Sequence, residues 1–201
     1  MRYTVFVLAF AAAGCFTTKY TPVVHLSIEP QPNVNPASTV DKSLGVRPLQ
    51  PALPYKQDVV YRGSEHVIAY QQGVMWAELP RDTVTRALVD ALTETKRFAD
   101  VGDAADLRVP DLILTGQLRK FDEVRIADPW MAECEVRLEL RAGIERRAVW
   151  AATLCAREPL AGNGPAALAA AMSRAVTRIV EQAAAAIVAL DETALGGETR
   201  P

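Results

Sequence analysis

The alternation of apolar and charged residues in AECEVRLELR, residues 132–141, constrains the fold of this chain most strongly. Every even position from Cys134 to Leu140 is apolar, and every odd position from Glu133 to Arg141 is charged. Successive side chains of a β-strand point to opposite faces, so this period of two predicts a strand with one buried and one solvated face. The chain must therefore build a sheet and cover one side of it.

A second strand is expected directly after this one. The residues AGIE provide a turn, and RRAVWAATLCARE, residues 146–158, follows. If Leu140 faces Val149, the same register places Cys134 opposite Cys155, which brings a cross-strand disulfide within geometric reach. Two buried free thiols are an equally good interpretation, because free cysteine packs well in protein cores.

Two amphipathic helices are predicted to cover the sheet. The first begins at Pro80, has apolar residues at helical spacing, and ends near Lys96 and Arg97, where cations favour the helix C-terminus. The second begins at Pro165, and its apolar stripe extends to Leu190. Proline suits the first turn of a helix because the N–H that it lacks would have no partner there.

Shorter segments complete the sheet. Residues 23–30 and 111–121 are predicted to be strands, and residues 58–70 a hairpin with RGSE at its tip. Residues 30–45, rich in Pro, Asn and Ser, are predicted to be a loop, and residues 46–54 at most an edge strand. We therefore predict an α+β fold, a two-layer domain with a mainly antiparallel sheet and two long helices packed on one face.

The first fifteen residues, MRYTVFVLAFAAAGC, have the order of an export signal. Arg2 is followed by the nine apolar residues 5–13, a run too short for a transmembrane helix, which needs about 20. The sequence AAGC resembles the bacterial lipobox, in which the cysteine becomes the first residue of the mature chain and carries acyl groups. Phe16, rather than aspartate, after that cysteine implies the outer membrane by the sorting pattern of such lipoproteins. Cleavage as an ordinary secreted protein is the alternative, because Ala12 stands where leucine is usual.

These observations divide the chain into four parts. We expect a signal peptide at 1–14, a tether at 15–22 lipidated at Cys15, an α+β domain at 23–190 and a flexible tail at 191–201. An exported chain lies where disulfides persist.

Composition and motifs argue against several classes of protein. Lys and Arg total 22 against 24 Asp and Glu, so there is no electrostatic reason to expect nucleic acid as a partner. The two histidines, His25 and His66, lie far apart, and no metal-binding, nucleotide-binding or nucleophile motif is present in the sequence. We expect neither enzymatic activity nor a metal or cofactor.

The tryptophans have structural and functional interpretations. Trp76 and Pro80 in WAELP are predicted to fix a strand-to-helix junction, in preference to a role of Glu78 as a general base. Trp130 ends the polar loop DEVRIADPW, where it either contacts a partner or covers the end of a sheet. Trp150 is expected on the charged face, where it is an interface candidate unless a helix covers it.

Four segments resemble the ABC-type transport auxiliary lipoproteins, the family of paraquat-inducible protein C: LPYKQDVVYR (53–62), WAELP (76–80), TKRFADV (95–101) and DLILTGQLRKFDE (111–123). The resemblance implies a non-enzymatic periplasmic domain, held at the outer membrane, that docks onto an MCE-domain protein. Such proteins carry phospholipid between membranes together with an inner-membrane ABC transporter. The resemblance assigns no site residue.

A partner interface is predicted from patterning alone. It comprises Trp130, Trp150, Glu133, Glu135, Arg137 and Glu139. Two other functions are open: a lipopolysaccharide-assembly-type outer-membrane lipoprotein, which would show a basic lipid-binding patch, and a secreted hydrolase, which would need a buried cluster of Glu, His or Ser.

Overall fold

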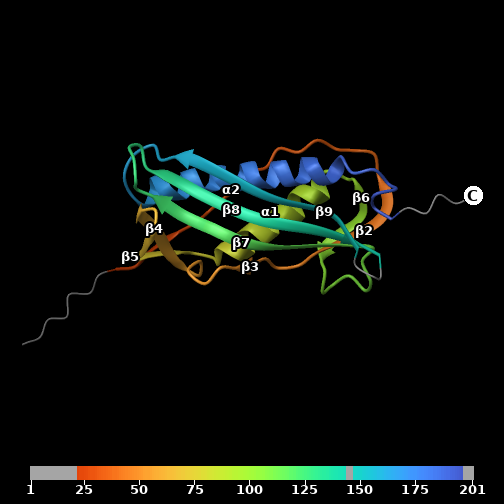
Figure 1. Ribbon diagram of the computed structural model, residues 1–201, viewed down its shortest axis with the longest axis horizontal. Helices are drawn as coiled ribbons and strands as arrows, with labels where there is room; N and C mark the ends of the chain where they lie inside the picture. The colour runs from red at the N-terminus through yellow and green to blue at the C-terminus, as the bar shows by residue number, and fades with distance from the viewer. Residues whose placement is uncertain (1–21, 144–146, 197–201) are drawn as a thin grey trace, which may run out of the picture.

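The structure is a computed structural model that describes residues 22–143 and 147–196, and its sheet is organised around one long strand. This strand, β7 (Leu112–Val124), pairs along its whole length with β8 (Met131–Ala142), which pairs with β9 (Arg147–Pro159), all antiparallel. Its other edge carries three short parallel strands one after another: β2 (Val40–Val46), β3 (Gln50–Pro51) and β4 (Asp58–Ser64). Figure 1 shows β7 and β8 crossing the full width of the molecule.

Three further strands extend the two ends of this sheet. β5 (Val67–Trp76) forms the predicted hairpin with β4, β1 (Val24–Leu26) lies parallel to β5, and β6 (Phe98–Asp103) lies parallel to β2. The α+β class is confirmed, but the prediction of a mainly antiparallel sheet is only partly correct, because the sheet is mixed. Parallel partners lie far apart in the sequence and leave no local turn signal.

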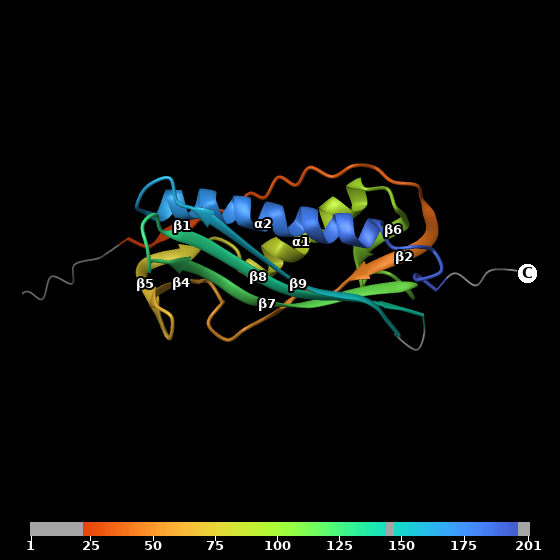
Figure 2. The same ribbon diagram turned by 45° about the horizontal axis from the view of Figure 1, so that its top comes forward.

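The two predicted helices lie together on one side of the sheet, as Figure 2 shows. α1 (Pro80–Glu94) and α2 (Pro165–Val188) begin at the predicted prolines. α2 packs against β8 and β9, and α1 packs against α2, β2 and β6. The stripe of α2 that faces the sheet is almost completely buried and comprises Leu168, Met172, Val176, Ile179, Ala183 and Ile187.

The C-terminal end of α1 differs from the prediction. The helix ends at Glu94, Lys96 adopts a left-handed conformation with φ of 52°, and Phe98 already begins β6. Arg97 does not face solvent at the helix end. It is 7% exposed and donates from Nη1 to the carbonyl oxygen of Ser38 at 2.7 Å. Lys96 and Arg97 were predicted to interact with the helix dipole. Instead, Lys96 forms a turn and Arg97 makes a buried tertiary contact.

The segment predicted as a loop at 30–45 has two parts. Its last residues form β2, and its first part follows α2 in an extended path, visible along the helix in Figure 2. The N–H groups of Glu29, Gln31 and Asn33 donate to Ser173, Thr177 and Glu181, at 3.1, 3.0 and 2.8 Å. Two residues of extended chain advance about as far as four residues of helix, so each alternate residue meets the next turn. Pro30 and Pro32 fall between the donors, where no N–H is needed.

The junction residues and the predicted tail both contribute to the core. Trp76 ends β5, is 1% exposed, and packs edge-to-face on Phe121 with ring centroids 5.2 Å apart. Pro80 is the first residue of α1. Leu195, in the segment predicted to be flexible, is 2% exposed. Cys15 and the predicted signal peptide, residues 1–14, lie outside the described residues.

Candidate functional site

The face of the sheet that the helices leave uncovered, called the outer face below, carries a compact charged cluster. Glu133 lies at its centre with a side chain only 3% exposed. Lys120 Nζ lies 3.0 Å from Glu133 Oε1 and 3.2 Å from Glu135 Oε2. Arg157 Nη2 lies 3.1 Å from the same Glu133 oxygen. Three adjacent strands, β7, β8 and β9, therefore contribute to one ion-pair network.

This network keeps Glu133 ionised. Burial alone would raise the pKa of the Glu133 carboxyl, but hydrogen bonds from Lys120 and Arg157 outweigh it and lower the pKa below its ordinary value. The same contacts raise the pKa of Lys120, mainly through its hydrogen bond to Glu133. At neutral pH the cluster is therefore a fixed set of paired charges.

A second ion pair continues the cluster toward β4. Asp122, which lies opposite Glu133 in the β7–β8 ladder, is fully buried and pairs with Arg62. Arg62 Nη2 also donates to the hydroxyl of Tyr55 at 3.1 Å. Burial, with the neighbouring Asp122 charge, raises the pKa of Tyr55 well above its usual range. Tyr55 is thus a neutral, buried member of this cluster.

The predicted register of β8 and β9 is wrong by one residue. Leu140 lies opposite Trp150 and Cys134 opposite Ala156, whereas Arg141 lies opposite Ala148, so Val149 is an extra residue on β9. This β-bulge shifts every pair beyond it. Cys155 consequently lies opposite Glu135, and both cysteines are free, Cys134 buried and Cys155 exposed. The structure therefore contradicts both predicted alternatives, a pair of facing cysteines and two buried free thiols.

The same shift moves Trp150 off the charged face. Trp150 lies opposite the buried Leu140 and packs, half-buried, against the hydrophobic core. Trp130 is also half-buried against the core, and the Arg125 guanidinium lies 4.6 Å from its ring centroid. The two tryptophans of the predicted interface therefore do not join Glu133 and Glu135 on one surface. Glu139 pairs with Arg141 at 2.5 Å, and Arg137 lies between Gln117 and Thr153 in the sheet.

One group of side chains has the composition of a metal site. Ligand atoms of Glu133, Glu135 and Cys155 lie within 4.8 Å of one another. Lys120 and Arg157 already form ion pairs with the Glu133 carboxylate. A structural zinc site also usually has four ligands, and this group has three. These residues fit a salt-bridge network better than a cation site.

Glu78, the candidate general base, is part of the start of α1. It accepts hydrogen bonds from Thr83 Oγ1 at 2.8 Å and from Arg86 Nη2 at 2.7 Å. The hydrogen bond from Arg86 lowers the pKa of Glu78, which makes it a poorer proton acceptor. These contacts support the structural interpretation of WAELP as a strand-to-helix junction.

Sequence reasoning did not identify five members of the cluster, namely Lys120, Asp122, Arg157, Arg62 and Tyr55. The available signal was the polar pair Asp122–Glu123 inside an otherwise strand-like segment. A bulge between Leu118 and Lys120 brings Lys120 opposite Glu135, and nothing in the local sequence indicates this bulge.

The edge formed by β9 is open. Apart from β8, no strand within residues 22–143 and 147–196 pairs with β9. Natural edge strands are usually short or are protected by charges and prolines. β9 has 13 residues, and residues 148–156 contain no charge and no proline. Its exposed side chains in this stretch are small, namely Ala148, Ala151, Thr153 and Cys155. This edge has the properties of a strand that pairs with another chain.

The chain matches the family described as ABC-type transport auxiliary lipoprotein component over residues 25–184. It belongs to this family. The match includes every strand of the sheet except the first residue of β1, and most of α2. The family is one of auxiliary components of ABC-type transport systems, and lipoprotein membership suggests a membrane-anchored place in the cell envelope.

Two solved structures share the fold of this auxiliary lipoprotein. A DUF330 protein from Xanthomonas campestris is 19% identical, with a TM-score of 0.73 over 84% of this chain and 95% of its own. A hypothetical protein from Chlamydia trachomatis is 8% identical, with a TM-score of 0.51 over 76% of this chain and 100% of its own. A comparison with curated proteins found no match. Within the described residues, no helix combines the length and apolarity that a membrane span needs.

Proposed function

We propose that this protein is a non-enzymatic accessory subunit of an MCE/ABC-type system that moves phospholipid between membranes. Cys15 carries the acyl chains that hold it on the periplasmic side of the outer membrane, and the folded domain docks the MCE tube there. The family match over residues 25–184 is the observation that carries this proposal. The AAGC sequence at Cys15 supports the anchor.

The open β9 edge is the proposed docking element for the MCE protein. An edge strand binds an extended segment of a partner through main-chain hydrogen bonds, and alternate side chains supply specificity. The outer-face charges beside this edge, including Glu133, Glu135, Arg137 and Glu139, form the polar rim of the interface.

The function is tested by a pulldown from crosslinked membranes of the native host, with a tag at the C-terminus and identification by mass spectrometry. Recovery of an MCE protein with ABC-transporter subunits supports the proposal. Recovery of a β-barrel protein alone contradicts it and favours a lipopolysaccharide-assembly role. Recovery of no envelope protein also contradicts it.

The docking edge is tested with a matched pair of variants. Thr153 and Gln117 flank Arg137 in one cross-strand row, Thr153 on the open edge and Gln117 two strands further in. Thr153→Lys adds the type of charge that natural edge strands use against pairing, so recovery of the MCE protein should fall about tenfold. Gln117→Lys adds the same charge inside the sheet and should leave recovery unchanged. Equal recovery with both variants contradicts the edge as the docking element.

A further inference from the structure

The exposed apolar side chains of this domain gather at one end. Eight large apolar residues are exposed in the described part of the chain, and two of them, Leu53 and Val109, lie elsewhere. The other six are Val23, Val24, Val67, Ile68, Tyr70 and Ile126. We call these six the apolar end. Contiguous exposed apolar surface on a small domain marks a contact with a partner or with lipid.

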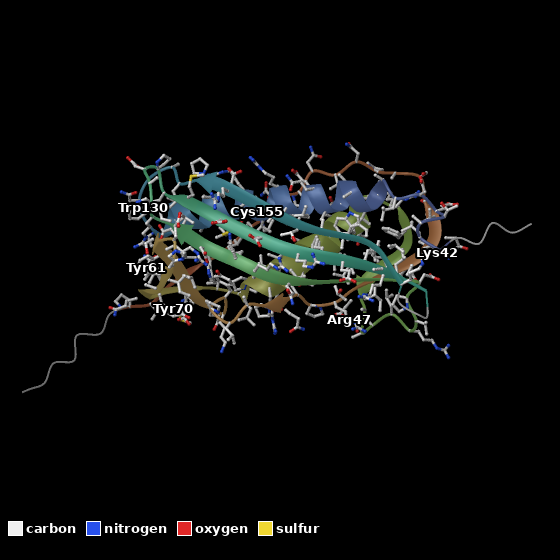
Figure 3. All side chains as sticks on the ribbon, viewed as in Figure 1. Lys42, Arg47, Tyr61, Tyr70, Trp130 and Cys155 are labelled. Atoms are coloured by element: carbon white, nitrogen blue, oxygen red, sulfur yellow. The ribbon has the colours of Figure 1, made fainter. Side chains whose placement is uncertain are left out.

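Strand pairing brings Val67, Ile68 and Ile126 to the same end. Val67 and Ile68 follow the turn of the β4–β5 hairpin, where Ile68 lies opposite Arg62. Arg62 also lies opposite Val124 at the end of β7, and the N–H of Arg125 donates to the Arg62 carbonyl at 2.8 Å. Ile126 is the next residue, so its loop lies beside the hairpin tip. Figure 3 shows Tyr70 at this end together with Tyr61 and Trp130.

The chain enters the domain at this same end. β1 is parallel to β5, with Val24 opposite Val74, so the residues that precede β1 come from the side where β5 begins at the hairpin. Val23 lies eight residues after Cys15, and eight residues span at most about 30 Å in any conformation. An acyl anchor at Cys15 would therefore keep the apolar end within reach of the bilayer surface.

The loop that presents Ile126 is held rigidly. The Arg125 guanidinium lies 4.0 Å from the centroid of the Tyr61 ring and 4.6 Å from that of Trp130. Its Nη2 also contacts the buried carboxylate of Glu123 at 2.5 Å. This stack fixes the loop backbone at Arg125, the residue before Ile126, and its two aromatic side chains are of the kind enriched at membrane interfaces.

The charges at this end favour apolar contact over attraction to anionic lipid. Residues 63–70 contain one formal charge, Glu65, and residues 125–130 contain Arg125 and Asp128. Arg125 is engaged by Glu123. Residues 63–70 and 125–130 thus contain no cluster of free cations that would bind lipid headgroups electrostatically.

We propose that the apolar end lies in the interfacial region of the lipid bilayer to which Cys15 is anchored. The hairpin tip and the 125–130 loop insert Val67, Ile68, Tyr70 and Ile126 between lipid headgroups, to the depth of about 5–10 Å that interfacial elements reach. This contact fixes how the domain stands on the membrane and turns the β9 edge away from the lipid tails. It rests on the proposed anchor at Cys15 and is independent of the MCE partner.

The test places a tryptophan at matched exposed positions. Val67 is 60% exposed at the apolar end, and Val109 is 72% exposed in the loop before β7, at the opposite end of that strand. The full chain is expressed with its leader, purified from membranes and reconstituted into phosphatidylethanolamine–phosphatidylglycerol vesicles with or without brominated acyl chains. Bromine quenches only tryptophans that reach the lipid. The wild type, with Trp76, Trp130 and Trp150, gives the background.

We expect brominated vesicles to remove about half of the emission that Val67→Trp adds, because an inserted interfacial ring lies near the acyl chains. The emission that Val109→Trp adds should be unchanged. Combining Val67→Trp with Ile68→Glu should abolish the quenching, since a charge keeps the hairpin out of the bilayer. Equal quenching at both positions, no quenching at Val67→Trp, or quenching that survives Ile68→Glu overturns the proposal.

The same preparation separates this inference from the proposed anchor. The mass of the N-terminal peptide shows whether Cys15 carries acyl chains. If it does and the two variants quench alike, the anchor stands and the bilayer contact fails. If it does not, the anchor fails, and the unacylated chain mixed with the same vesicles must still show the contrast between the two variants for the bilayer contact to stand.

Discussion

Cys155 lies directly opposite Glu135 in the β8–β9 ladder, on the outer face of the sheet. Cys134, one position away on β8, points to the opposite face and is completely buried. The two thiols are therefore separated by the sheet itself, although they lie on neighbouring strands. Their chemical environments differ accordingly.

We predict that, of the two cysteines in the described residues, only Cys155 reacts with a thiol reagent in the folded protein. Burial, followed by the negative charges of Glu133 and Glu135, raises the pKa of Cys155, so its reaction should be slow at neutral pH and accelerate as the pH rises. Burial raises the pKa of Cys134 further and blocks access, so it should react only after unfolding. Peptide mapping after iodoacetamide pulses measures both reactions, and Cys155→Ala should remove the one that occurs in the folded protein. A Cys134–Cys155 disulfide in non-reduced protein would contradict the register.

The buried carboxylate of Glu133 should make stability sensitive to acid. Its folded-state pKa lies below the ordinary value of 4.5, so its contribution is complete above that pH and is lost as the pH falls through the lower folded-state pKa. Glu133→Gln should lower the free energy of unfolding by about 1–3 kcal/mol at pH 7, because Lys120 and Arg157 lose the carboxylate that they share. This loss of unfolding free energy should become smaller in acid, where the wild-type Glu133 carboxylate is protonated as well.

Urea titrations at pH 7 and below 4.5 measure this difference. Glu139→Gln is the matched control, since Glu139 lies on the same face of β8 but is more exposed than Glu133 and pairs with Arg141 near the surface. If Glu133→Gln and Glu139→Gln have the same effect at both pH values, the buried network does not stabilise the fold.

Sequence patterns indicated the elements whose environment is set locally. β8 was predictable because one of its faces meets the core and the other meets charges along its whole length. Both helices were predictable from their apolar stripes and from Pro80 and Pro165. β2 and β6 were not, because their contacts are parallel pairs such as Leu44 with Val101 and with Leu112, formed between distant segments.

The candidate site was predictable only in composition. The alternation in β8 correctly indicated a charged face, but the partners of its charges depend on two bulges, at Arg119 and Val149, that carry no glycine or proline to reveal them. The one-residue shift at Val149 moved Trp150 to the core side and Cys155 to the charged side. A period of two determines which residues share a face, and it leaves the pairing across strands undetermined.

The extended segment along α2 should open locally when its central hydrogen bond is removed. Gln31 lies between Pro30 and Pro32, so its N–H is the only backbone donor in residues 30–32. It donates to Thr177 Oγ1. Thr177→Val keeps the shape of the side chain but removes the acceptor, at a cost of about 0.5–1.5 kcal/mol. Hydrogen exchange should show faster exchange of the Gln31 amide.

Thr93→Val is the control for this experiment. The Thr93 hydroxyl donates to the Val89 carbonyl within α1, so its loss leaves no N–H without an acceptor. The Gln31 amide should exchange at the wild-type rate in this variant. Unchanged exchange in Thr177→Val as well would show that packing of the segment, without this hydrogen bond, holds it on α2.

Gly116 should tolerate no side chain, because an added Cβ would overlap the backbone of β8. A Cβ there would lie 2.5 Å from the backbone oxygen of Arg137 and 2.8 Å from Leu49 Cδ2. The oxygen belongs to the β8 backbone, so it cannot move away without distorting the ladder on which the charged cluster depends. Gly116→Ala should therefore lower the free energy of unfolding by about 2–3 kcal/mol, in the range of core overpacking.

The matched substitution is Gly63→Ala in β4, where an added Cβ meets nothing within 4 Å. It should change stability by no more than about 0.5 kcal/mol in the same urea titration. A cost for Gly116→Ala as small as that for Gly63→Ala would mean that β7 and β8 separate easily at Gly116. The close pairing that sets Asp122 beside Glu133 would then not be a rigid feature of the sheet, and the outer-face cluster could not act as a fixed surface for a partner.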